Sequence, residues 1–254
     1  MKHQIKSSIK NPIRNNIKRT TEVTYADEVL ADNPIIYIKG NTNDVGIDSS
    51  GNSYNMVENG TINSVARSGF PESSVIDLST KQDLPMNYQG NELNETGDIT
   101  FEMWAEFTEA TTGWIDLFHY GIAALETEES NYFYLYYYKP AGSRRIVYVH
   151  EYGAGLNETT TEISYEIPVG VPNHIVCTRD ATTKTVKIYI DSVEIGSTTY
   201  VNAPTGGTSS SCITPIGNIG SGGGQMPGYV SSFAVYHSKL STDRIEAHYA
   251  KGSS

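Results

Sequence analysis

The strongest constraint on this chain's fold is a series of short apolar or alternating runs separated by turn residues. Gly, Ser, Asn, Asp and Pro gather in segments such as 48–52, 140–143 and 206–211, and no amphipathic helical pattern intervenes. We expect strands over residues 35–38, 100–107, 114–120, 132–138, 146–152, 162–167, 174–179, 185–190 and 229–236. Many short strands at near-regular spacing predict an all-β, antiparallel two-sheet β-sandwich of the jelly-roll type.

Helical signals occur only near the two ends of this strand series. A short helical pattern covers residues 24–31, and we expect the helix to end before Pro34. A second helix is expected over residues 242–250. Ser241 is a favourable N-cap, Leu240 and Ile245 can form a hydrophobic staple, and Gly252 can end the helix.

The charge of the chain is unevenly distributed. Its 18 Lys and Arg and 29 Asp and Glu give a formal net charge of −11, yet residues 1–19 contain no acid. The cations there are Lys2, Lys6, Lys10, Arg14, Lys18 and Arg19. Ile recurs at every fourth position, as Ile5, Ile9, Ile13 and Ile17. The chain is therefore a basic tail on an acidic body.

The four-residue repeat places the isoleucines on one face of an extended chain and the cations on the other. In a helix the Ile stripe would drift, and Pro12 would interrupt it. We interpret residues 1–24 as an extended docking arm and residues 25–254 as the globular domain. A disordered basic tail is the alternative that the sequence leaves open.

Other sequence features bound the environment of the chain. It contains no run of 18 apolar residues, and its N-terminus lacks the apolar stretch of a signal peptide, so we expect no membrane partner and no export signal. Cys177 and Cys212 are too few and too far apart for a metal knuckle, and we expect free thiols, although their pairing stays open. The acidic body argues against specific nucleic-acid binding.

Tyrosines dominate the middle of the chain. Tyr132, Tyr134, Tyr136 and Tyr138 alternate along one expected strand, and Tyr148, His150 and Tyr152 alternate along the next. Burial of the apolar residues would place the odd-numbered residues of both strands on one side of the hairpin; these are Phe133, Leu135, Val147 and Val149. In that register the even-numbered residues of both strands form one array of rings. Such a face suits a subunit interface or stacking of a sugar, and ordinary packing against a second layer is the alternative.

Four stretches, taken in order, carry a family resemblance: residues 29–37 with 48–52, 97–104 (GDITFEMW), 174–180 with 187–192, and 216–217 with 227–236 and 239–252. They resemble the concanavalin A-like, laminin-G-like jelly rolls, in particular those of phage and bacterial surface proteins. The resemblance implies a jelly roll across residues 29–252. It also implies that Trp104 packs between the two sheets.

The same resemblance bears on metals and catalysis. Ser231 and Ser232 stand where the family usually has an acidic pair, which puts a calcium site in doubt, and Asp44 and Asp48 are better explained as turn residues. We therefore expect no cofactor.

Glucanases of this fold carry a Glu-x-Asp-x-Glu pattern that this chain lacks. Glu102 and Glu106 share a strand face beside Trp104, and we expect one or both to lie near strand ends or loops. The His-Glu-x-x-His and Gly-x-Ser-x-Gly motifs are also absent. We expect no enzymatic activity on polysaccharides.

The sequence thus predicts a non-enzymatic virion structural protein of a phage, such as a capsid decoration or fibre protein, assembled in the host cytoplasm. Its arm would anchor it to capsid or neighbouring subunits, and it would form homo-oligomers. The alternative is a carbohydrate-binding adhesin that recognises host or environmental glycan. The virion expectation rests on the family resemblance and the arm, because a fold alone does not determine function.

Overall fold

The structure is a computed structural model. It describes residues 22–41, 43–56, 62–79, 96–108, 113–120, 133–139, 143–152, 157–204, 213–214 and 226–254. The predicted anchoring residues of the arm, Tyr132 and Cys212 lie outside the described residues.

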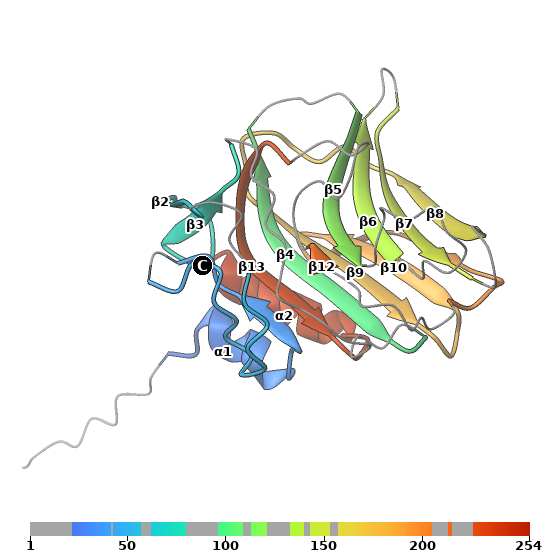
Figure 1. Ribbon diagram of the computed structural model, residues 1–254, viewed down its shortest axis with the longest axis horizontal. Helices are drawn as coiled ribbons and strands as arrows, with labels where there is room; N and C mark the ends of the chain where they lie inside the picture. The colour runs from blue at the N-terminus through green and yellow to red at the C-terminus, as the bar shows by residue number, and fades with distance from the viewer. Residues whose placement is uncertain are drawn as a thin grey trace, which may run out of the picture.

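Two antiparallel sheets face each other across the molecule (Figure 1). In the described part of the chain the large sheet has the order β11-β10-β9-β4-β13-β3-β2, with β1 also paired to β13. The small sheet has the order β12-β5-β6-β7-β8. This arrangement confirms the predicted two-sheet antiparallel sandwich.

In the described part of the chain nine strands correspond to the predicted runs, although β8 begins and ends earlier than predicted, whereas β2, β3, β11 and β12 were not predicted. Those of the large sheet are β1 (Ile36–Ile38), β2 (Ser64–Ala66), β3 (Ser74–Asp77), β4 (Ile99–Phe107), β9 (Asn173–Asp180), β10 (Thr185–Ile190), β11 (Val193–Thr199) and β13 (Gly228–Tyr236). Those of the small sheet are β5 (Gly113–Tyr120), β6 (Phe133–Lys139), β7 (Arg145–Glu151), β8 (Glu158–Ser164) and β12 (Ile213–Thr214).

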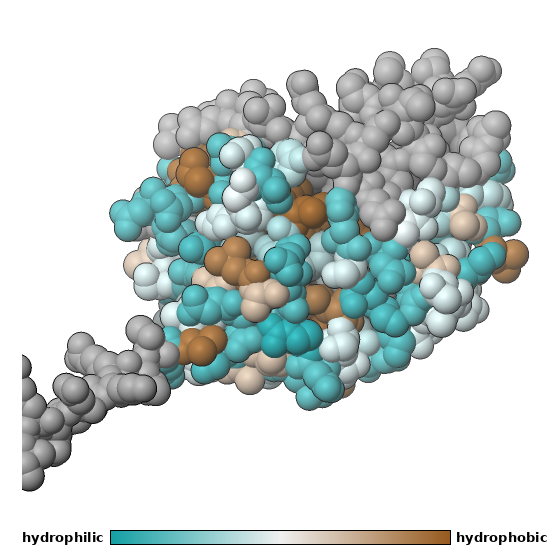
Figure 2. Space-filling model, turned by 90° about the horizontal axis from the view of Figure 1, so that it is seen from below, coloured by the Kyte–Doolittle hydropathy of each residue, from teal (hydrophilic) through white to brown (hydrophobic). Residues whose placement is uncertain are grey.

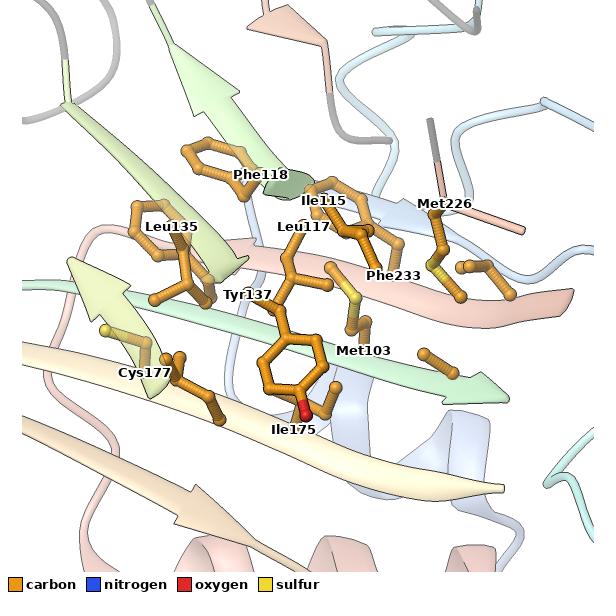
Figure 3. Close-up of a cluster of buried hydrophobic side chains, with 14 of the residues drawn as sticks. Met103, Ile115, Leu117, Phe118, Leu135, Tyr137, Ile175, Cys177, Met226 and Phe233 are labelled. Carbon is orange, nitrogen blue, oxygen red and sulfur yellow. The ribbon is translucent and has the colours of Figure 1, made fainter. Parts of the chain in front are cut away.

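The main hydrophobic core fills the space between the two sheets. Side chains of β5 and β6, including Leu117, Phe118 and Leu135, point toward Phe233 and Met103 of the large sheet (Figure 3). The rings of Phe101 and Phe118 stack across the layers with centroids 3.9 Å apart. Alternation along each strand supplies these inward side chains and leaves every second residue on the outer face.

Two helices cover the outer face of the large sheet. The first is α1 (Tyr25–Ala31), which Thr24 begins with a capping box, and the second is α2 (Thr242–Gly252), with the predicted N-cap Ser241. They bury a second hydrophobic cluster that includes Val29, Tyr236 and Ile245. The centre of the large sheet is therefore buried on both faces, as continuous burial along β4 and β9 also shows.

Trp104 belongs to this second cluster, so the expectation that it packs between the sheets is wrong. Its ring lies parallel to that of Tyr249 on α2, with centroids 5.8 Å apart. The predicted helix stop, Gly252, is instead the last residue of α2, and a Cβ there would lie 2.4 Å from the Trp104 ring. Gly252 is thus explained by close packing on Trp104 and not by a left-handed turn.

The face seen from below in Figure 2 is largely hydrophilic, with separate hydrophobic patches. Among the described residues, neither helix has the length and apolar character needed to cross a membrane.

Candidate functional site

Four aromatic side chains lie on the outer face of the small sheet. Trp114 comes from β5, and Tyr134, Tyr136 and Tyr138 come from β6. Register places them together, because Trp114 pairs with Tyr138, and Asp116 with Tyr136, across the two strands. We call these four residues the aromatic face.

The rings of the aromatic face form one contiguous array. Trp114 stacks on Tyr136, with ring centroids 5.2 Å apart and ring planes 13° apart. Tyr134 also stacks on Tyr136, with ring centroids 5.5 Å apart. Tyr138 meets Trp114 edge-on at 5.2 Å. Tyr136 is 8% exposed, whereas Trp114 is 47% exposed. An apolar ring of this size open to solvent is the most available stacking surface of the array.

Residues of β7 and β8 support the rings and give them a charged border. Val147 and Val149 are buried and form a small cluster with Tyr136. The Arg145 guanidinium lies 4.8 Å from the centre of the Tyr138 ring and also pairs with Glu162. The aromatic face therefore packs on buried valines of the neighbouring strand β7, and it has one cation and one anion at its border.

Asp116 is the polar residue within the array. It is 9% exposed, and burial raises the pKa of its carboxyl to about 6. It lies on the outer face, because its strand partner is Tyr136, while its neighbours Ile115 and Leu117 enter the core. Sequence reasoning missed Trp114, Asp116 and Arg145 as site residues. The available signal was a single acid within the otherwise apolar alternation of residues 114–118.

The predicted register of the tyrosine hairpin is wrong. Odd-numbered residues of β6 pair with even-numbered residues of β7, so Leu135 lies opposite Tyr148 and Tyr136 lies opposite Val147. A shift of one residue moves an entire strand face to the other side of the sheet. Val147 and Val149 are buried as predicted, but under the tyrosine rings and not between the sheets.

Tyr148 and His150 consequently lie in the interior and not on the aromatic face. Both are fully buried. The Tyr148 hydroxyl accepts a hydrogen bond of 3.1 Å from Arg179 Nη1, and His150 Nε2 lies 2.9 Å from the carbonyl oxygen of Asn202. Tyr152 lies beyond the end of β7 and is half-buried. Of the predicted tyrosines, the structure brings together Tyr134, Tyr136 and Tyr138.

Glu102 and Glu106 share a face of β4, as expected. Glu106 lies near the end of that strand, as expected of one or both, whereas Glu102 lies in its interior. Both carboxylates point away from the small sheet and have partners in the structure. Glu102 is 1% exposed beneath the helices, and Glu106 accepts a 2.7 Å hydrogen bond from Arg67 Nε. Neither carboxylate is placed to act on a substrate held by the aromatic face.

Asp48 performs the turn role that the sequence predicts. Its Oδ1 accepts hydrogen bonds of 2.9 Å from the backbone N–H groups of Tyr37 and Ser50, and its Oδ2 accepts one from Tyr54. The carboxylate thereby ties β1 to the turn that follows it.

A second depression lies on the outer face of the large sheet, beside the start of α2. It has a volume of about 260 Å³ and is lined by residues that include Asp180, Lys187 and Lys239. Lys239 Nζ lies 2.6 Å from Asp180 Oδ2, and Lys187 Nζ lies 2.8 Å from Glu194 Oε2. Since these lysines already have acidic partners, the aromatic face is the stronger candidate site.

The fold and the aromatic face define a lectin-like β-sandwich. The chain belongs to the concanavalin A-like lectin/glucanases superfamily, whose laminin G-type profile matches residues 79–246. A search of curated proteins finds no sequence match to this chain.

Several solved structures share the fold at low sequence identity. The binding domain of Paraclostridial mosquitocidal protein 1 matches with a TM-score of 0.61 and 16% identity, over 87% of this chain and 52% of that one. The binding domain of botulinum neurotoxin serotype G matches with a TM-score of 0.63 and 12% identity, over 86% and 51%. The receptor-binding domain of botulinum neurotoxin D matches with a TM-score of 0.60 and 14% identity, over 87% of this chain and 53% of that one. The chain therefore spans about half the length of these binding domains.

Proposed function

We propose that this chain is a non-catalytic glycan-binding module whose aromatic face binds the sugar. The observation that carries the proposal is the stacked array of Trp114, Tyr134, Tyr136 and Tyr138 around the buried carboxylate of Asp116. Aromatic rings offer a flat apolar surface to the C–H face of a sugar, and a carboxylate accepts hydrogen bonds from its hydroxyls. The resemblance to toxin binding domains supports a binding role over a catalytic one.

The arrangement of the carboxylates supports the absence of hydrolysis. Retaining and inverting glycosidases both need two carboxyl groups that flank the scissile bond. Asp116 is the acid beside the central ring of the aromatic face. Glu162 at its border is paired with Arg145, and Glu158 lies at the far end of the edge strand β8. Glu102 and Glu106 lie on the far side of the other sheet. We therefore propose that the module binds glycan without cleaving it.

Replacing Trp114 with alanine should weaken glycan binding about 5- to 30-fold, which corresponds to roughly 1–2 kcal/mol for one exposed stacking ring. Because Trp114 is 47% exposed, the melting temperature should change little. A glycan array identifies the ligand, and calorimetry with the wild type and Trp114→Ala measures the affinities.

Val201→Ser is the matched control, since Val201 is an exposed apolar residue, 80% accessible, outside the aromatic face. It should leave the affinity unchanged. Equal affinity of Trp114→Ala and wild type would contradict the location of the site. A wild-type protein that binds no glycan on a broad array would contradict the function.

Attachment to a phage particle is a second proposal, and the observation that favours it is the fourfold Ile repeat of the arm. We propose that its Ile face buries in an apolar groove of a capsid protein or a neighbouring subunit. Each buried Ile would contribute about 1.5–3 kcal/mol, against about 0–1 kcal/mol for an exposed cation pair. Localisation in a virion and homo-oligomer formation belong to this proposal and could coexist with glycan binding.

Deletion of residues 1–20 should leave a folded sandwich that no longer joins its assembly. The described domain begins with its own cap, because the Thr24 side chain accepts from the backbone N–H of Asp27. Changing Ile5, Ile9, Ile13 and Ile17 to Ser should have nearly the same effect, whereas neutralising the cations should give a weaker, salt-dependent defect. Incorporation of the truncated chain into particles at normal copy number would refute anchoring.

A further inference from the structure

The Asp116 carboxylate is unusual among the charged groups of this chain. It is 91% buried on the outer face of a sheet, and no hydrogen bond or ion pair joins it to another described residue, yet its oxygens are not among the fully enclosed polar atoms of the described residues and remain open to a ligand. Its burial is the cause of its raised pKa, and no neighbouring charge contributes to the shift. Most buried polar side chains in folded proteins have a hydrogen-bond partner, so this carboxylate calls for an explanation.

A partnerless buried carboxylate lowers the stability of the fold. Its folded-state pKa of about 6 lies above the value of about 3.9 for an unperturbed Asp, so folding favours the protonated form. The resulting loss of stability develops as the pH rises from about 4 through 6 and is fully present above that range. A ligand that donates hydrogen bonds to the ionised group would remove part of this penalty on binding.

Local structure fixes where this acceptor points. Asp116 pairs with Tyr136, whose ring is the central member of the aromatic face, and Trp114 precedes it by two residues on the same side of β5. The register changes immediately after Asp116, between Asp116 and Phe118, so that Leu117 and Phe118 both enter the core. Strand irregularities of this kind re-aim side chains next to functional sites.

We propose that Asp116 is the polar contact of the glycan site, accepting hydrogen bonds from two adjacent hydroxyls of a neutral sugar whose ring stacks on Trp114. This inference rests on the proposed glycan-binding function and adds the substrate class. A carboxylate has two acceptor oxygens and no donor, which matches a vicinal diol. It also discriminates strongly, because a ligand that lacks these donors leaves the buried acceptor without a partner.

The charges around Asp116 favour a neutral sugar over an acidic one. The described ionisable side chains that share this sheet face on the packed strands are Tyr134, Tyr136 and Tyr138 on β6, Arg145 on β7, and Glu158 and Glu162 on β8. Arg145 is already paired with Glu162. A sialylated or sulfated glycan would therefore bring its anion toward a buried carboxylate, and no unpaired cation among the described side chains of this face would compensate for it.

The test compares the wild type with Asp116→Asn on neutral glycans and on sialylated or sulfated glycans. The isosteric amide should lower the affinity for the neutral ligand about tenfold or more, since it removes a charged acceptor. It should also raise the melting temperature at pH 7.5 by about 2–4 °C, because the buried charge is lost. A residue that serves only the structure would not combine weaker binding with higher stability.

The control variant is Glu246→Gln, which removes one charge from an exposed position of α2, on the far layer of the molecule. It should change neither the affinity nor the melting temperature. Wild-type affinity should decline as the pH falls from 7.5 to 5, because protonation of Asp116 removes an acceptor, while the affinity of Asp116→Asn should stay flat. This wild-type pH profile tests the inference without any variant.

Three results would overturn the inference. Asp116→Asn could bind the neutral glycan as tightly as the wild type, the wild-type affinity could be independent of pH over this range, or the array could show binding to acidic glycans alone. If Trp114→Ala loses binding while Asp116→Asn keeps it, the aromatic face is a glycan site and only the role of Asp116 fails. If the wild type binds no glycan, the proposed function fails as well.

Discussion

Replacing Glu102 with alanine is expected to destabilise the protein by about 3–5 kcal/mol, a large part of the stability of a typical domain. Its carboxylate is 1% exposed and has four partners. Oε1 accepts from the Tyr25 hydroxyl at 2.8 Å and lies 2.8 Å from His174 Nε2. Oε2 accepts from the Tyr236 hydroxyl at 2.7 Å, and both oxygens lie 3.0 Å from His248 Nδ1. Urea unfolding of wild type and variant measures the difference.

The electrostatics of this cluster explain the size of the effect. Burial by itself would raise the pKa of Glu102, but hydrogen bonds from His174 and His248 hold that pKa well below its usual range. Burial by itself would lower the pKa of His248, yet Glu102 and Asp32 raise it. Removing Glu102 therefore leaves polar groups of α1, α2, β9 and β13 buried without their shared acceptor.

Glu246→Ala is the matched control for Glu102, because Glu246 is an exposed glutamate on α2. Its effect should stay within about 0.5 kcal/mol. A loss below about 1 kcal/mol for Glu102→Ala would mean that solvent or rearranged neighbours satisfy the freed groups. Tyr25→Phe and Tyr236→Phe each remove one donor and should cost about 1 kcal/mol apiece.

Periodicity was sufficient to predict most strands that carry apolar side chains and the closing helix with its Ser241 cap. It missed the short strands β2, β3 and β12, and it failed where strands are polar. β11 (Val193–Thr199) was not predicted, because most of its residues are exposed and Gly196 interrupts it. β8 (Glu158–Ser164) was predicted too late in the chain, because it consists mainly of Thr and Glu. Edge strands with one open face carry too few buried residues to produce a clear signal.

The candidate site was predicted in part for a related reason. The alternation of residues 132–138 correctly indicated a tyrosine face on one strand. Which face of β7 lies beside it depends on the register of the hairpin, and the hydrophobic pattern of β7 is ambiguous, because both of its faces are buried. Tyr148 was therefore assigned to the wrong side, and Arg145 was missed. Trp114 joins the face through the pairing of β5 with the next strand, β6, and the sequence pattern does not show the register of that pairing.

The position that the family resemblance implied for Trp104 was wrong for a similar reason: β4 is buried on both faces, so sequence alone does not say which layer each face contacts. In the structure Phe101 and Met103 contact the small sheet, whereas Trp104 contacts the helices. This assignment has a measurable consequence, because it predicts with which residues Trp104 is energetically coupled.

Trp104→Ala is expected to cost about 3–5 kcal/mol, since the ring is 2% exposed and its loss leaves a large cavity. The ring stacks on His174, with centroids 5.1 Å apart, and on Tyr249 of α2, with centroids 5.8 Å apart. Loss of the ring should therefore loosen α2 as well as lower global stability. Thermal unfolding and hydrogen exchange at the amides of α2 measure the two effects.

Double-mutant cycles with more conservative substitutions keep this prediction testable if Trp104→Ala does not fold. Trp104→Phe combined with Tyr249→Leu should show a coupling of about 1 kcal/mol, because both changes disrupt the same stacked pair. Trp104→Phe combined with Phe118→Leu should be additive within about 0.5 kcal/mol, because Phe118 lies between the sheets, on the other side of β4. The reverse pattern, coupling to Phe118 and additivity with Tyr249, would mean that Trp104 packs in the core between the sheets and not against the helices.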